Sequence, residues 1–133
     1  MGRETVKALN PTEGFEVVAL IGRNTIADSF REVVPDGPDL PLENRLGAAL
    51  DRTQPDVVVD YAHYSAAAEH AEHFSKRGIP FIFGMSGIGD ADIRLIRASC
   101  KETGVPGMIV PNFAIGAVLM MRFAEMAAAW LPD

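Results

Sequence analysis

Two loops carry the residues whose types and spacing best suit ligand binding. Gly84-Met85-Ser86-Gly87 and Val110-Pro111-Asn112-Phe113-Ala114-Ile115-Gly116 each follow directly after an apolar, strand-like run. Glycines let a backbone pass close to a flat ring, Ser86 offers a hydroxyl, and Asn112 offers both an amide donor and a carbonyl acceptor. This combination favours a dinucleotide site. A bare turn between a strand and a helix is the alternative interpretation of Gly84–Gly87, and bracing of neighbouring loops is the alternative for Asn112.

A third segment bears on which dinucleotide would bind. Gly2 stands at a predicted helix start, where free N–H groups favour a phosphate, and the residue that contacts the adenosine ribose is expected roughly 20 residues later. An acidic residue there would bind a free 2′-hydroxyl, but the chain has Gly22 with Arg23 beside it. Space and a guanidinium suit a 2′-phosphate, which favours NADP over NAD. An ordinary Gly-Arg-Asn turn is the alternative.

Aromatic and histidine side chains near these loops allow more than one interpretation. Tyr61 and Phe113 suit the wall of a nicotinamide pocket, although aromatic residues at strand ends more often pack in a core. His63 lies in a loop at the expected cleft, where a surface histidine is the commoner case. His70 and His73 are spaced like metal ligands on one helix, but the sequence offers no third and fourth ligand, so we predict no metal site.

No serine, cysteine or histidine arrangement in the sequence predicts covalent catalysis, so the visible chain is predicted to bind rather than to react. Its formal net charge of −6 argues against a general binder of nucleic acid or of anionic membranes. The first residues lack the apolar core of a secretory signal, and the single cysteine, Cys100, fits a reduced, cytoplasmic setting. The apolar stretch from Ala114 to Leu131 carries Arg122 and Glu125 near its middle, which predicts a buried or partner-facing helix rather than a membrane span.

The elements expected to position the loops alternate between strands and helices. The apolar runs typical of buried parallel strands are Val17–Ile21, Val57–Val59, Phe81–Phe83 and Met108–Val110. The predicted helices are Gly2–Leu9, Leu46–Asp51, Ala66–Lys76 with Ser65 as N-cap, and Ala91–Lys101 with Asp90 as N-cap. This order predicts an α/β, doubly wound parallel sheet.

Two parts of the pattern are irregular. The segment from Asp28 to Pro41 holds too many prolines and glycines for a regular element and is expected to be a surface excursion. Nothing strand-like precedes Met1, although the first strand of such a fold is central, so the chain is expected to begin within the motif. Loss of a central strand would expose two inner edges and should leave the chain aggregated or molten unless another chain fills the gap.

Taken together, these segments resemble dihydrodipicolinate reductase, the 4-hydroxy-tetrahydrodipicolinate reductase of lysine and diaminopimelate biosynthesis. The resemblance spans almost the whole chain. The resemblance rests on the segments Met1-Gly2-Arg3-Glu4, Val58-Val59-Asp60-Tyr61 and Gly84-Met85-Ser86-Gly87. Its most specific part is Val110-Pro111-Asn112-Phe113-Ala114-Ile115-Gly116.

The resemblance implies a cofactor site. Its expected members are Met1 and Gly2 at the end of a phosphate turn, Arg23 at the ribose, Tyr61 in place of a usual phenylalanine, Gly84, Met85 and Ser86 near the nicotinamide, and Val110, Pro111, Asn112 and Phe113 before an inter-domain hinge. Met85-Ser86 replaces a threonine pair, so nicotinamide contacts through hydroxyls are expected to be fewer. Gly22 replaces a usual acidic residue, which again favours NADPH, with NADH as the second choice.

The resemblance also implies how the chain is divided and what it does. Residues 1–113 would form a Rossmann-like NAD(P)-binding domain that is incomplete at its N-terminus, and residues 114–133 a hinge helix. The catalytic segment and the α+β domain that binds the dicarboxylate substrate and forms a homotetramer would lie beyond Asp133. The intact enzyme would transfer hydride from NADPH, and the chain alone is expected to be inactive. The alternatives are a stand-alone nucleotide-binding or regulatory module and, last, another Rossmann dehydrogenase cut short.

Overall fold

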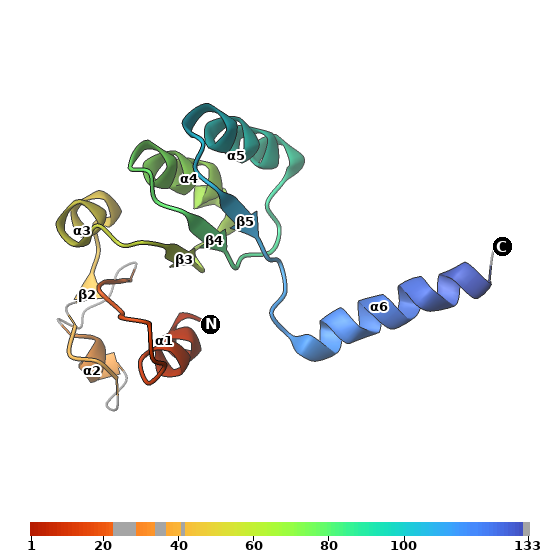
Figure 1. Ribbon diagram of the computed structural model, residues 1–133, viewed down its shortest axis with the longest axis horizontal. Coiled ribbons are helices and arrows are strands. Elements are labelled where there is room, and N and C mark those ends of the chain that lie inside the picture. Colours follow the sequence, from red (N-terminus) through yellow and green to blue (C-terminus); the bar gives the residue numbers. More distant parts are fainter. Residues whose placement is uncertain (23–28, 34–36, 41, 132–133) are drawn as a thin grey trace. The chain divides into compact units, whose positions relative to one another are not determined.

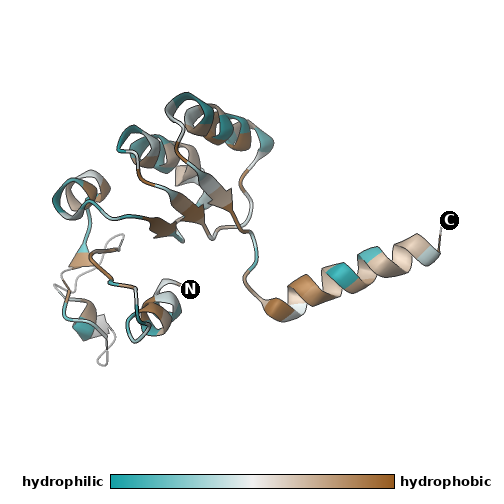
Figure 2. Cartoon of the chain, in the orientation of Figure 1, coloured by the Kyte–Doolittle hydropathy of each residue, from teal (hydrophilic) through white to brown (hydrophobic). Residues whose placement is uncertain are grey.

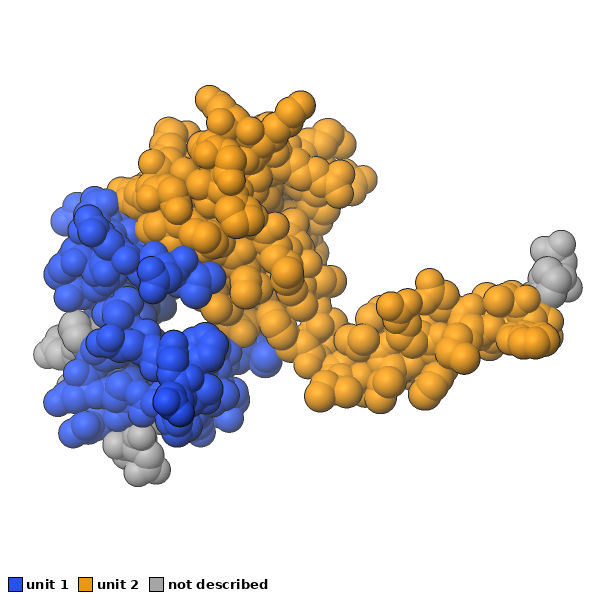
Figure 3. Space-filling model, viewed as in Figure 1, with its two compact units in different colours: residues 1–58 blue, residues 59–133 orange. Residues whose placement is uncertain are grey.

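The computed structural model describes residues 1–22, 29–33, 37–40 and 42–131. The chain divides into two compact units, residues 1–58 and residues 59–133 (Figure 3). The boundary falls within one short strand, and each unit has its own sheet and its own buried side chains.

In the residues that the structure describes, the first unit contains a two-stranded parallel sheet and three helices. Its elements are α1 (Gly2–Leu9), β1 (Leu20–Ile21), α2 (Phe30–Val33), β2 (Leu42–Glu43) and α3 (Leu46–Thr53) (Figure 1). Leu20 lies opposite Leu42 in the β1–β2 pair. Val6 of α1 and Phe30 of α2 are the buried centre of a small apolar cluster, which also contains the side chain of Val17. This cluster is what holds α1 in the unit.

The second unit contains a three-stranded sheet with helices between its strands. Its elements are β3 (Val58–Asp60), the 3₁₀ turn η1 (Tyr64–Ala66), α4 (Ala67–Lys76), β4 (Phe81–Phe83), α5 (Asp90–Thr103), β5 (Gly107–Ile109) and α6 (Ile115–Trp130). The strand order is β3-β4-β5, and β4 pairs parallel with β5 so that Phe81 lies opposite Gly107. Helices α4 and α5 lie side by side (Figure 1).

The core of the second unit is built on aromatic rings. Phe74 of α4 and Phe81 and Phe83 of β4 are almost fully buried, with ring centroids 4.8 to 6.1 Å apart. A Cβ on Gly107 would lie 2.4 Å from Phe81 Cζ and 3.1 Å from Cys100 Sγ. A glycine is therefore required in β5 for the Phe81 ring to lie against the neighbouring strand.

The predicted α/β class and the parallel pairing are confirmed, with α1 and β4 matching their predicted bounds. The other strands are displaced by one residue or, for Val17–Ile21, shortened to Leu20–Ile21. Within the described residues, β1 pairs with β2, and β4 lies between β3 and β5.

Three local predictions are wrong. Asp90 is the first residue of α5 and Gly89 is its N-cap, while the N–H of Ser65 is capped by the His63 side chain. Ser65 lies inside the 3₁₀ turn η1 with its hydroxyl 2.9 Å from His63 Nδ1, and Ala66 is the N-cap of α4, without a side-chain cap. The segment from Asp28 to Pro41 contains α2, which the packing of Phe30 against Val6 stabilises despite the nearby prolines.

Helix α6 is apolar along most of its length, with a hydrophilic band near its middle (Figure 2). None of its residues is buried, so the predicted burial within this chain is wrong, and the alternative of a partner-facing helix stays a prediction. Its exposed large apolar residues are Ile115, Val118, Leu119, Met120, Met121, Phe123, Met126 and Trp130. Arg122 and Glu125 form an ion pair along the helix, at 3.0 Å between Nη1 and Oε2. In the described part of the chain, no helix combines the length and apolarity that a membrane span requires.

Candidate functional site

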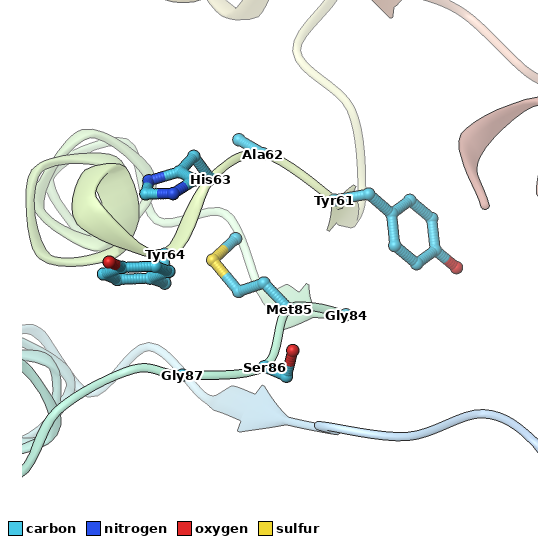
Figure 4. A pocket seen from close by; sticks show the side chains of 8 residues that line it. All are labelled: Tyr61, Ala62, His63, Tyr64, Gly84, Met85, Ser86 and Gly87. Atoms are coloured by element: carbon cyan, nitrogen blue, oxygen red, sulfur yellow. The ribbon is translucent and has the colours of Figure 1, made fainter.

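The loops that follow β3 and β4 line an open pocket of about 530 Å³ (Figure 4). Open parallel sheets bind ligands at the carboxyl ends of their strands, which is where this pocket lies. Its lining residues are Tyr61, Ala62, His63, Tyr64, Gly84, Met85, Ser86 and Gly87. The Tyr61 ring stands at one end of the pocket and the Tyr64 ring at the other (Figure 4).

The two pocket loops are tied together at Asp60, the last residue of β3. The N–H of Gly84 donates to the Asp60 carbonyl oxygen at 2.8 Å, which extends the β3–β4 contact into the loops. The Asp60 carboxylate accepts the N–H of Ala62 through Oδ1 at 2.7 Å. Its Oδ2 lies 2.6 Å from Nδ1 of His70 on α4. Asp60 therefore holds the start of its own loop by a side-chain turn and is itself held from α4.

The environment of His70 favours its protonated form. The hydrogen bond that the imidazole donates to Asp60 raises the pKa of His70, and the negative charges of Asp60 and Glu69 raise it further, while burial lowers it. The net effect is a pKa above the ordinary histidine value. The contact is consequently an ion pair when the imidazole is protonated, and the raised pKa extends this state to higher pH than for an ordinary histidine.

Gly84 is enclosed by two aromatic rings. A Cβ there would lie 2.3 Å from Tyr61 Cε1 and 2.7 Å from Phe113 Cε2, distances that no real Cβ tolerates. The Tyr61 and Phe113 rings meet edge to face, with centroids 5.8 Å apart. Phe113 is brought here because the N–H of Val110 donates to the Phe83 carbonyl at 2.8 Å, which continues the β4–β5 pairing past the end of β5. The glycine thus makes room for rings of this chain.

A second glycine supports the other end of the pocket. Gly87 has φ of +88°, a conformation that residues with a Cβ rarely adopt, and an added Cβ would contact the Tyr64 ring at 3.4 Å. The Tyr64 ring lies 4.1 Å from the His63 imidazole, centroid to centroid. Nδ1 of His63 accepts the N–H of Ser65 at 3.3 Å and lies 2.9 Å from its hydroxyl. The His63 and Tyr64 rings therefore pack against each other at this end of the pocket, and Ser65 holds the imidazole in place.

The remaining predicted residues of this unit have distinct environments. Met85 is 5 % exposed and packs in the pocket floor, whereas the neighbouring Ser86 is exposed. Asn112 Oδ1 accepts the N–H of Ala114 at 2.8 Å, which is the loop-bracing alternative considered above. Val110 is half-buried and Pro111 is exposed.

The predicted phosphate-turn residues belong to the first unit. Met1 is exposed, and its carbonyl accepts the N–H of Glu4 at 2.9 Å, so it begins the first turn of α1 with Gly2 as the first helical residue. Arg23 lies outside the described residues. The structure thus brings together Tyr61, Gly84, Met85 and Ser86 in one pocket, with Phe113 against its wall.

Two of the pocket residues, Tyr64 and His63, were not assigned to the site from the sequence. Tyr64 was not singled out, because an aromatic residue at a helix start looks like core packing. His63 was expected at the surface, and it is exposed there while also lining the pocket. Its position just after a strand is the signal that could have identified both residues.

The described residues contain no group of three or more His, Cys, Asp or Glu side chains arranged to hold a metal ion. His70 bonds to Asp60, while His73 is contacted by the guanidinium of Arg77 through its Nδ1 and its carbonyl. The two histidines therefore have separate partners, although they share one helix.

Comparisons with known proteins agree with one another. Residues 1–113 match the family described as dihydrodipicolinate reductase, N-terminus. The chain is 36% identical to the 4-hydroxy-tetrahydrodipicolinate reductase of Syntrophomonas wolfei and 37% identical to that of Halalkalibacterium halodurans, covering 100% of this chain and 50% and 51% of those proteins. A solved structure of dipicolinate-bound dihydrodipicolinate reductase from Paenisporosarcina sp. TG-14 matches with a TM-score of 0.79 and 30% identity, over 99% of this chain and 51% of that one. The chain spans about half the length of the curated relatives it matches.

Proposed function

Because this chain belongs to the dihydrodipicolinate reductase family, we propose that it supplies the NADPH-binding part of a 4-hydroxy-tetrahydrodipicolinate reductase. The observation that carries the proposal is the pocket at the carboxyl ends of β3 and β4, built from the loops that match the family. Similarity to relatives over the full length of the chain supports the same assignment.

The residues of the pocket suit part of a nicotinamide dinucleotide. A volume of about 530 Å³ lies within the range of small-molecule sites. The rings of Tyr61 and Tyr64 offer flat apolar walls, and Ser86 offers an exposed hydroxyl. We assign Gly84, Met85 and Ser86 to the nicotinamide end, with Val110, Pro111, Asn112 and Phe113 supporting it. Met1 and Gly2 are assigned to the phosphates.

A preference for NADPH over NADH rests on Gly22 and Arg23. A charge-assisted contact between Arg23 and the 2′-phosphate is worth about 1.5–3 kcal/mol, or roughly 10- to 150-fold in affinity. Arg23→Ala should therefore weaken NADPH binding by that factor and leave NADH binding almost unchanged. Arg31→Ala, which removes an exposed arginine of the first unit, is the matched control. Equal losses for both nucleotides with Arg23→Ala would refute the assignment.

The reaction requires more than these residues. When bound, the cofactor supplies the hydride; this chain's residues bind it, orient it and shield one side of its ring. We propose that residues 1–113 form the cofactor domain and that α6, within residues 114–133, is a hinge helix whose exposed apolar side chains pack on a substrate-binding and tetramer-forming domain. The proton donor and the groups that bind the dicarboxylate would come from that domain. The intact enzyme would act in lysine and diaminopimelate biosynthesis in the cytoplasm.

The proposal is tested by comparing the natural full-length protein with residues 1–133 alone. We expect NADPH-dependent reduction of 4-hydroxy-tetrahydrodipicolinate by the former, no turnover by the latter, and a tetramer in sedimentation of the former. Turnover by residues 1–133 would overturn the assignment of catalysis to another domain. NADPH binding without reduction by the full-length protein would instead favour the alternative, a stand-alone nucleotide-binding or regulatory module.

A further inference from the structure

The carboxylate of Asp60 links the pocket to a helix behind it. One oxygen accepts the N–H of Ala62 at 2.7 Å, and the other lies 2.6 Å from Nδ1 of His70. The side chain of Asp60 is only 10% exposed and that of His70 only 22%. The contact is therefore largely shielded from water, where a hydrogen bond between charged groups is strong.

This contact restrains the loop that supplies half of the residues lining the pocket. A carboxylate held at a single oxygen can rotate about its own bonds, which would let the Ala62 N–H lose its acceptor. His70 removes that freedom because it holds the second oxygen from α4, an element that packs firmly on the sheet through Phe74. The residues of the loop, Tyr61 to Tyr64, begin directly after Asp60 and include both aromatic ends of the pocket.

We infer that His70 is a positioning residue for the nicotinamide dinucleotide: by holding Asp60, it fixes the Tyr61–Tyr64 loop in the shape that lines the pocket. This rests on the proposed function, since it names a residue that prepares the same site without touching the ligand. His70 does not line the pocket, so its effect on binding must pass through Asp60 and the loop.

The electrostatics of the pair agree with this role. The charged groups that act on the His70 imidazole are Asp60, from β3, and Glu69, from α4 itself, and both raise its pKa. The ring of Phe74 lies 6.1 Å away, centroid to centroid, and contributes no charge. The hold on Asp60 is thus stronger when the imidazole is protonated and weaker, though still present as an N–H donor, when it is neutral.

Three substitutions separate positioning from general packing. His70→Asn retains an N–H donor at the δ position, whereas His70→Leu fills similar space without a donor. His73→Leu is the matched control, because His73 lies one turn further along α4 and contacts Arg77 rather than Asp60. Each is made in the natural full-length protein.

The two measurements are amide hydrogen exchange of peptides spanning residues 60–66 and the Kd for NADPH at pH 6 and pH 8, each relative to wild type. We expect His70→Leu to raise loop exchange and to raise the Kd, each by about tenfold. His70→Asn should bring both the loop exchange and the Kd for NADPH most of the way back to the wild-type values. The remaining difference from wild type should be larger at pH 6 than at pH 8. His73→Leu should match wild type.

The outcomes discriminate between this inference and the proposed function. Wild-type exchange and affinity in His70→Leu would overturn the inference, as would faster loop exchange with unchanged NADPH affinity, and both leave the proposed function intact. A His70→Asn variant as impaired as His70→Leu would also overturn it, because the donor would then not matter. If the wild-type protein binds neither NADPH nor NADH, the proposed function fails and the inference falls with it.

Discussion

Gly84 offers the sharpest test of how the pocket is built. A Gly84→Ala substitution adds one methyl group at a point 2.3 and 2.6 Å from two carbons of the Tyr61 ring and 2.7 Å from Phe113 Cε2. Carbon atoms pack at about 3.5–4.0 Å, so the rings must move by about 1 Å or more, or the strand end must shift. The Gly84 N–H bond to the Asp60 carbonyl opposes a backbone shift.

The cost of this overpacking should be about 1–3 kcal/mol of the free energy of unfolding, the usual range for an inserted methyl group in a packed site. Because the clash is with named rings, truncating one of them should relieve it. In a Tyr61→Ala background, the same Gly84→Ala substitution should cost less than in the wild type, because only the 2.7 Å approach to Phe113 remains. Urea unfolding of the wild type, both single variants and the double variant gives the coupling between the two positions.

A matched control is Gly89→Ala, since a Cβ at Gly89 meets no atom within 4 Å and its φ of −75° is open to any residue. Its expected cost is below about 1 kcal/mol, from a slightly weaker helix N-cap. Equal stability of wild type and Gly84→Ala would refute the reasoning. So would a Gly84→Ala cost that stays the same when Tyr61 is truncated.

Three further outcomes follow from the same contacts. Phe81→Ala should lower the free energy of unfolding by about 3–5 kcal/mol, because the ring is 2% exposed and packs on Phe74; a urea midpoint near that of wild type would contradict this. Asn112→Ala should lower the free energy of unfolding by about 1 kcal/mol because the Ala114 N–H loses its acceptor. Asn112→Asp keeps an acceptor oxygen and should therefore keep the stability of the wild type. The raised pKa of His70 means that the imidazole holds its proton more tightly in the folded state than in the unfolded state. The resulting contribution to the free energy of unfolding is complete below the ordinary pKa of 6.5 and is lost as pH rises through the raised pKa of the folded state. The stability difference between wild type and His70→Leu should therefore shrink from pH 6 to pH 8, and a difference that grows with pH would exclude the mechanism.

The sequence predicted the elements whose signals are local. The run Phe81–Phe83 is apolar and is bounded by Pro80 and Gly84, so its limits follow from residue types alone. Helix α2 could not be predicted, since its four residues are stabilised by the packing of Phe30 on a residue 24 positions earlier, Val6. Contacts between residues so far apart in the chain leave no local pattern.

The candidate site was predictable in location but not in its internal contacts. Parallel strands bring their carboxyl ends to one edge, so the loops after Asp60 and Phe83 were expected to meet, and they do. The sequence indicated that Gly84 lets the backbone pass close to a flat ring. It did not indicate that the nearest rings are those of Tyr61 and Phe113 in this chain. The hold of His70 on Asp60 depends on the placement of a helix against a strand, which residue spacing does not specify.

The three residues of β4 give the chain little freedom to change its core without changing its pocket. Phe83 is fully buried, yet its carbonyl oxygen holds Val110 and the next residue along the chain is Gly84. A core substitution that shifts β4 by a few tenths of an ångström is transmitted to both loops, since no flexible spacer lies between them. Evolution and protein engineering should therefore find stability and nucleotide affinity coupled at Phe81 and Phe83. The exposed side chains of α4 and α5, such as Glu72 and Leu95, offer positions that can vary independently of the pocket.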